Sequence, residues 1–171
     1  MSAQLNDAVA PHKRGIPAWW VTIFLFWLGW IFMYADRTVL NPVMGELEKE
    51  FGLSGTQLGL MNSVFYFSYA LLQVPAGILG DKIGKKKVLI PGFLLFGAFT
   101  AVTGWAKSWS TLLFARVVTG AGEGTYYGPQ YGISSEQIPK KYRSLGSAII
   151  NSGMAFGIAL GLMASSWLVY D

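Results

Sequence analysis

The chain has 171 residues, of which 53% are hydrophobic and only 13% are charged, a balance typical of membrane proteins. It contains no cysteine and one histidine, His12, which excludes disulfides, thiol chemistry and a metal site built from cysteine and histidine. The formal net charge of +4 arises mainly from basic residues in short loops, so lipid explains the charge and a nucleic-acid partner is not needed.

Five uncharged or nearly uncharged stretches follow a polar N-terminal tail, residues 1–17. Because about 20 apolar residues cross a bilayer as a helix, each stretch predicts a transmembrane helix. The predicted helices cover about 18–40, 54–80, 87–106, 110–135 and 144–170. We therefore predict an all-α, multi-pass membrane protein with one transmembrane domain, 18–171. Its connections are short, so sequential helices are expected to be antiparallel neighbours.

The first predicted helix is expected to end near Asn41 and Pro42, because proline disfavours helix at the residue before it. An acidic, amphipathic segment, GELEKEFGLS, leads from there to Ser54, the expected N-cap of the second helix. The first apolar run is too long for a signal peptide and has no cleavage site after it, so we expect it to be retained.

Basic residues cluster in alternate connections, and the positive-inside rule therefore places the N-terminus and these connections in the cytoplasm. The clusters are Lys13 and Arg14; Lys82, Lys85, Lys86 and Lys87; and Lys140, Lys141 and Arg143.

Four ionisable residues fall within the predicted spans: Asp36, Arg37, Arg116 and Glu123. Each would cost about 2.5–3.5 kcal/mol at the centre of a bilayer, so they are expected to face the bundle interior or water. Arg116 and Glu123 are seven residues apart and share one helix face, whereas Asp36 and Arg37 point about 100° apart. One helix can thus offer a titratable acid on one side and an anion site on the other. The alternative is that Asp36 with Arg116, or Arg37 with Glu123, form buried ion pairs that only orient helices.

Weaker polar and glycine patterns accompany these charges. Tyr66, Tyr69 and Gln73 form a stripe in which Tyr69 and Gln73 could hydrogen-bond a hydroxylated ligand, although tyrosine is also common at membrane interfaces. Asn151 could bind a ligand, but an interhelical hydrogen bond is favoured. Glycines at G-x-x-x-G spacing predict close helix packing; they are Gly153, Gly157 and Gly161.

The segment GILGDKIGKKK, residues 77–87, places Asp81 at the end of the second helix. Asp81 is expected to bond a neighbouring helix N-terminus or an arginine as a conformational latch, unless the segment is a solvated turn. The segment resembles the G-x-L-x-D-[RK]-x-G-[RK]-[RK] loop of the major facilitator superfamily. The matching residues are Gly77, Leu79, Asp81, Lys82, Gly84, Lys85 and Lys86.

Three further stretches, YADR, FARVVTGAGEG and NSGMAFGIALG, resemble the anion:cation symporter family of that superfamily, which includes sugar-acid transporters. The segment IPKKYRSLGSA departs from it, since Tyr142 stands where the family often has glutamate. The resemblance implies a bacterial inner-membrane location and specific residue roles. Asp36 and Glu123 would carry protons with Arg116 as their partner, Arg37 would bind the substrate carboxylate, and Tyr34 and Tyr69 would line the site.

The resemblance also implies twelve helices in two halves of six. The chain is therefore expected to be the first five helices of a proton-coupled organic-anion symporter that works by alternating access. Its expected partners are lipid, a small organic anion and the missing C-terminal helices. The five helices alone are not expected to transport. Protons are the expected coupling ion, with no other cofactor. A proton-coupled drug or metabolite antiporter is an alternative, although a cationic substrate would not favour Arg37 and Tyr34 in its cavity. A non-transporting receptor or subunit remains open, and no nucleophile–base constellation suggests an enzyme.

Overall fold

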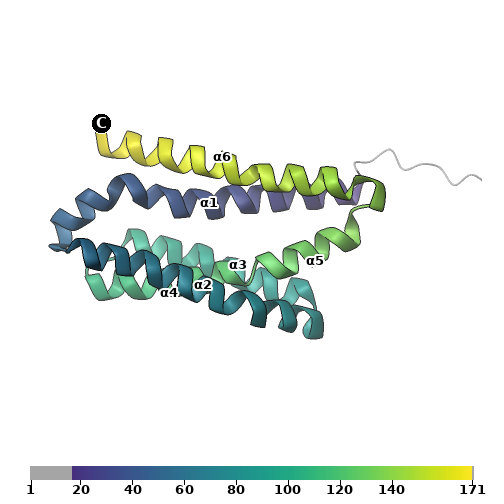
Figure 1. Cartoon of the computed structure of the whole chain (residues 1–171), viewed down its shortest axis with the longest axis horizontal. Helices are drawn as coiled ribbons and strands as arrows, with labels where there is room; N and C mark the ends of the chain where they lie inside the picture. Colours follow the sequence, from purple (N-terminus) through teal and green to yellow (C-terminus); the bar gives the residue numbers. More distant parts are fainter. Residues whose placement is uncertain (1–16, 171) are drawn as a thin grey trace, which may run out of the picture.

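The computed structural model describes residues 17–170, with side chains to Trp167, and almost all of these residues are helical (Figure 1). The predicted all-α class is confirmed. The N-terminal tail with His12, Lys13 and Arg14 lies outside the described residues. The helices are α1 (Ala18–Phe51), α2 (Gly55–Ile83), α3 (Lys85–Gly104), α4 (Trp109–Gly124), α5 (Tyr127–Gln137), the short 3-10 helix η1 (Lys140–Tyr142) and α6 (Arg143–Tyr170).

Four helical stretches are individually long and apolar enough to cross a membrane: α1, α2, α3 and residues Lys140–Trp167. The fourth predicted span is covered by α4 and α5 together. The chain is therefore an integral, multi-pass membrane protein with five helical segments, one of which is broken.

The predicted end of the first helix at Asn41–Pro42 is wrong, because α1 continues through Pro42 to Phe51. A proline inside a helix removes one backbone hydrogen bond, and membrane helices tolerate this where neighbours satisfy the freed group. The helix ends instead at Gly52, whose φ of 61° is left-handed and whose N–H donates to the carbonyl oxygen of Glu48. The acidic segment thus forms the last turns of α1.

The predicted single helix over 110–135 is also wrong, since α4 ends at Gly124 and α5 begins at Tyr127. Pro129 lacks the N–H that would bond to the carbonyl of Thr125, so the α-helical ladder cannot continue across this point. The Thr125 and Tyr126 N–H groups donate to carbonyls three residues back, at 3.2 and 3.0 Å. Figure 1 shows α5 turning away from α4 after this break.

Residues 77–87 form almost no loop, because α2 continues to Ile83 and α3 begins at Lys85. Gly84 alone separates the helices, and its φ of 107° is a conformation that side-chain-bearing residues rarely adopt. At the other end of α2, Ser54 is the N-cap, and its hydroxyl accepts from the Gln57 N–H at 3.3 Å.

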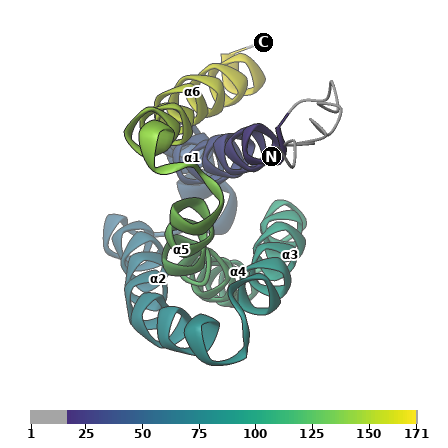
Figure 2. The same cartoon turned by 90° about the vertical axis from the view of Figure 1, so that its right-hand side faces the viewer.

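The helices form two layers (Figure 2). α1 and α6 lie side by side and run in the same direction, and they make the most extensive helix contact among the described residues. α4 packs between α2 and α3 in the second layer, and α5 lies between the layers. The prediction that neighbours in sequence pack together is therefore wrong for α1, whose main partner is α6.

Glycines explain these contacts. A Cβ added at Gly153 or Gly157 would lie 2.5 Å from the carbonyl oxygen of Trp27 or Ile31, and one at Gly161 would lie 2.7 Å from that of Ala35. The three glycines are spaced four residues apart on α6, and the three carbonyls that they face are spaced four residues apart on α1. The close packing predicted for this glycine series is therefore confirmed. Two α4 glycines work in the same way, with Gly122 against α3 and Gly124 against α2.

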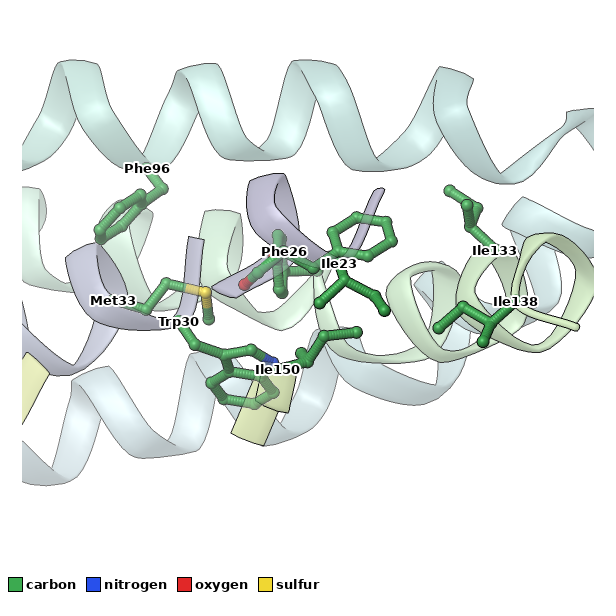
Figure 3. Close-up of a cluster of buried hydrophobic side chains, with 9 residues drawn as sticks. Ile23, Phe26, Trp30, Met33, Phe96, Ile133, Ile138 and Ile150 are labelled. Carbon is green, nitrogen blue, oxygen red and sulfur yellow. The ribbon is translucent and has the colours of Figure 1, made fainter. Parts of the chain in front are cut away.

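The described core joins both layers at the α4–α5 break (Figure 3). Tyr126 stands at this break, donates its hydroxyl to the carbonyl of Phe26 at 3.2 Å and packs edge-on against Trp30. The buried cluster consists of Ile23, Phe26, Trp30, Met33, Phe96, Tyr126, Ile133, Ile138 and Ile150.

Candidate functional site

The four ionisable residues of the spans meet between the layers as two ion pairs. Arg116 on α4 bonds Asp36 on α1, with 2.9 Å between Nη1 and Oδ2. Arg37 on α1 bonds Glu123 on α4, with 2.6 Å between Nη2 and Oε2 and 2.8 Å between Nε and the same oxygen. The residues Asp36, Arg116 and Glu123 expose only 8%, 2% and 0% of their surface. These pairs therefore bridge the α1 and α4 layers in a setting almost free of solvent.

The pairing differs from the prediction that Arg116 serves both acids, and the two pairs are those that the sequence offered as the alternative. Arg116 and Glu123 do share the inner face of α4, but Glu123 pairs with Arg37. Helix geometry explains this difference, since two turns separate Arg116 from Glu123 along α4 while α1 presents an arginine beside its aspartate. In this state the residue expected to bind an anion is already occupied by a carboxylate.

Aromatic rings surround the Arg37 guanidinium. Its central carbon lies 4.5 Å from the ring centre of Tyr69 and 4.9 Å from that of Tyr34, with Tyr66 and Phe65 at 5.8 and 5.7 Å. Such contacts stabilise a desolvated cation by about 0.5–2 kcal/mol each. The predicted residues Tyr34 and Tyr69 thus surround Arg37, and Tyr66, a weaker candidate, joins them.

Phe65 lies between the two arginines. The Arg116 guanidinium carbon is 4.3 Å from its ring centre, and the side chain of Phe65 is buried. Sequence reasoning missed this residue, because one phenylalanine in an apolar helix carries no distinguishing signal. Its position one residue before Tyr66 and four before Tyr69 was the only available indication.

The two ion pairs open into different pockets on opposite faces of α1. A pocket of about 260 Å³ is lined by Tyr34, Arg37, Thr38, Asn41, Asn62, Tyr66 and Ile158. We call it the arginine pocket. A cavity of about 300 Å³ is lined by Asp36, Arg116, Thr100, Thr103, Glu50 and apolar residues of α1, α3 and α4. We call it the aspartate cavity.

Two other predicted ligand residues lie apart from these pockets. Asn151 accepts a hydrogen bond from the Tyr131 hydroxyl at 3.1 Å, which is the interhelical bond favoured above. Gln73 is half-buried on α2 and lines neither pocket. The polar side chains of α2 that line the arginine pocket are Tyr66 and Asn62. Sequence reasoning did not single out Asn62, although it lies one helical turn before Tyr66.

The predicted latch has different partners from those expected. Asp81 is exposed and lies 3.4 Å from Lys85, and Lys85 bonds Glu136 of α5 at 2.7 Å. Among the described residues Asp81 thus contacts a lysine, and its bond to a helix N-terminus or an arginine stays a prediction. Lys82 and Lys86 are exposed, and Gly84 is the single residue between α2 and α3. The Cα of Gly77 lies 3.2 Å from a Cβ built at Gly128. Within the described part of the chain, no group of three acidic or histidine side chains could hold a metal ion.

Comparison with known proteins agrees with this arrangement of helices. The family model of the major facilitator superfamily matches residues 26–171. The chain belongs to the major facilitator superfamily. A solved structure of a bacterial homologue of the human lysosomal transporter Spinster, inward-facing and unoccupied, matches 86% of the chain and 31% of its own length, with a TM-score of 0.80 and 25% identity.

Two relatives in sequence are named for anions. The probable galactarate/D-glucarate transporter GarP of Escherichia coli (strain K12) is 30% identical over 96% of the chain and 38% of its own length. The probable anion transporter 1, chloroplastic, of Oryza sativa subsp. japonica is 31% identical over 97% of the chain and 32% of its own length. This major facilitator chain therefore spans about a third of the length of these relatives.

Proposed function

We propose that this major facilitator chain is the N-terminal part of a proton-coupled symporter for small organic anions, such as sugar acids or other carboxylates, that works by alternating access. The observation that carries the proposal is the Arg37–Glu123 ion pair inside a ring of aromatic side chains. The anion names of its relatives support the substrate class.

The coupling follows from competition for Arg37. Glu123 Oε2 contacts Nε and Nη2 of the guanidinium, so an incoming carboxylate that binds this side would displace the Glu123 carboxylate, which exposes 0% of its surface. An unpaired carboxylate is costly in such a site, so Glu123 would take up a proton as it releases Arg37. The Oε1 oxygen of Glu123 has no hydrogen-bond partner among the described residues and would accept that proton. Anion binding and proton binding thereby favour one another.

The second ion pair would control the opening of the helices. Protonation of Asp36 would release Arg116 and loosen the contact between α1 and α4, which supports a role for Asp36 and Arg116 in the change between outward and inward access. Each net positive charge carried inward gains about 2.3 kcal/mol per 100 mV, so two protons with a monoanion would be driven by the membrane potential.

The Glu123→Gln variant of the full-length protein, reconstituted in proteoliposomes, tests this function. We expect uptake driven by a proton gradient to be lost, because a glutamine cannot take up the coupled proton, while exchange of anion between the two sides persists. Glu48→Gln is the matched control, since Glu48 is an exposed residue near the end of α1. Proton-driven uptake by Glu123→Gln at the control rate would rule out the coupling role.

A further inference from the structure

The aspartate cavity lies on the face of α1 opposite the arginine pocket. It follows one stripe of α1 through positions 36, 39, 40, 43, 47 and 50, which a helix places on a single face over about 21 Å. The arginine pocket uses positions 34, 37, 38 and 41, which point about 150° away from that stripe. The two spaces share no lining residue. α1 therefore separates Asp36 from the space that would hold the anion.

The cavity contains polar groups without protein partners. Arg116 Nε and Thr100 Oγ1 are buried and make no hydrogen bond with any described residue. Buried polar groups in such positions are normally bonded to ordered water. A space of about 300 Å³ has room for about ten water molecules, taking about 30 Å³ for each. The cavity is thus polar enough and large enough to be hydrated.

The charges that line the cavity suit a route for a proton. Asp36 and Arg116 form its inner end, and Glu50, on the last turn of α1, lies at the other. α3 contributes Thr100 and Thr103, which bear hydroxyls and no charge. A chain of waters from Glu50 past the threonines would reach the Asp36 carboxylate without passing the arginine pocket.

We propose that the aspartate cavity is a hydrated proton passage to Asp36, separate from the route that the anion takes to Arg37. The passage rests on the proposed function, since it supplies the proton that would release Arg116 from Asp36 in a coupled transporter. It enters from the end of the bundle where α1 terminates, which is the outer side if the N-terminus is cytoplasmic. Its ligand is water with a mobile proton.

Single cysteines test hydration, because residues 1–171 contain no cysteine of their own. Any cysteine elsewhere in the full-length protein is first replaced. We expect a membrane-impermeant, charged methanethiosulfonate to modify Thr100→Cys and Thr103→Cys at least about tenfold faster than Thr119→Cys, since thiolate formation and reagent access both need water. Thr119 is the control because it exposes 0% of its surface and donates its hydroxyl to the Ala115 carbonyl. Modification of both cavity positions at the Thr119→Cys rate would overturn the proposal.

The second readout compares each variant before and after modification. A blocked cavity at Thr100→Cys should lower proton-driven uptake at least about tenfold, because the proton no longer reaches Asp36. It should leave the dissociation constant for the anion unchanged, because Thr100 does not line the arginine pocket. Modification of Asn62→Cys in the arginine pocket should weaken anion binding instead. Unimpaired proton-driven uptake after modification of Thr100→Cys, or a matching loss of anion binding there, would contradict separate routes. Cysteine labelling depends on hydration alone, so slow labelling of Thr100→Cys and Thr103→Cys would contradict a hydrated aspartate cavity. Proton-independent uptake by the unmodified protein would instead contradict the proposed function.

Discussion

At the scale of single residues, the site is organised around two arginines, of which Arg116 is buried and Arg37 is half-buried. Arg116 is held by Asp36 and Phe65, and Arg37 by Glu123 and a ring of tyrosines. Removing one member of a buried pair leaves an uncompensated charge, which is far costlier than removing both. In the proposed function this asymmetry would make each acid a switch, because protonation would remove only one charge of a pair.

The ring of Tyr69 gives a prediction for anion affinity. Tyr69→Leu should weaken anion binding by about two- to thirtyfold, since a cation–π contact is worth about 0.5–2 kcal/mol and confines the Arg37 guanidinium. Titration of the full-length protein with the anion measures the effect. Tyr69→Phe keeps the ring and should bind more tightly than Tyr69→Leu. Equal affinities for Tyr69→Leu and the unmodified protein would show that the ring does not hold Arg37 for binding.

At the scale of helices, glycine spacing decides which elements touch. The series Gly153, Gly157 and Gly161 lets α6 lie against the backbone of α1, and the α4 glycines admit α2 and α3. Close backbone approach is how membrane helices gain packing energy in a solvent as apolar as their side chains. The glycines thereby fix the position of α1, and with it the separation of the two pockets.

Gly157 tests this packing. A Cβ at this position would lie 2.5 Å from the Ile31 carbonyl oxygen, so Gly157→Ala must push α6 from α1. We expect it to destabilise the full-length protein by about 1–3 kcal/mol, the usual cost of overpacking. Denaturation in detergent measures this change. The control is Gly97→Ala, where nothing lies within 4 Å, and it should be neutral or slightly stabilising. Equal stabilities for the two variants would contradict the assigned α1–α6 contact.

The sequence predicted the helical class, the charged residues that meet between the layers and the glycine face of α6, because lipid makes polar and small residues conspicuous. It did not predict the passage of α1 through Pro42 or the break at Thr125, since these depend on how neighbouring helices satisfy freed backbone groups. It offered the pairing of Arg37 with Glu123 only as an alternative. Helix periodicity fixes directions around one axis but not the height at which two helices meet.

At the scale of the whole molecule, the ion pairs cross from the α1–α6 layer to the layer of α2, α4 and α3 (Figure 2). The α2–α3 junction and the connection from α5 to α6 lie at the end where α1 begins (Figure 1). Their lysines support a cytoplasmic position for that end under the positive-inside rule. Anion and proton would then enter from the opposite end, on the two faces of α1.

The central claim is that an anion replaces Glu123 at Arg37 and that Glu123 then takes up a proton. The number of protons bound with each anion tests it most directly, by calorimetry of the full-length protein in buffers of different ionisation enthalpy. The account predicts that Glu123→Gln takes up about one proton fewer per anion than the unmodified protein, because binding of the two ligands is linked. Equal proton uptake by both, or no uptake by the unmodified protein, would contradict it.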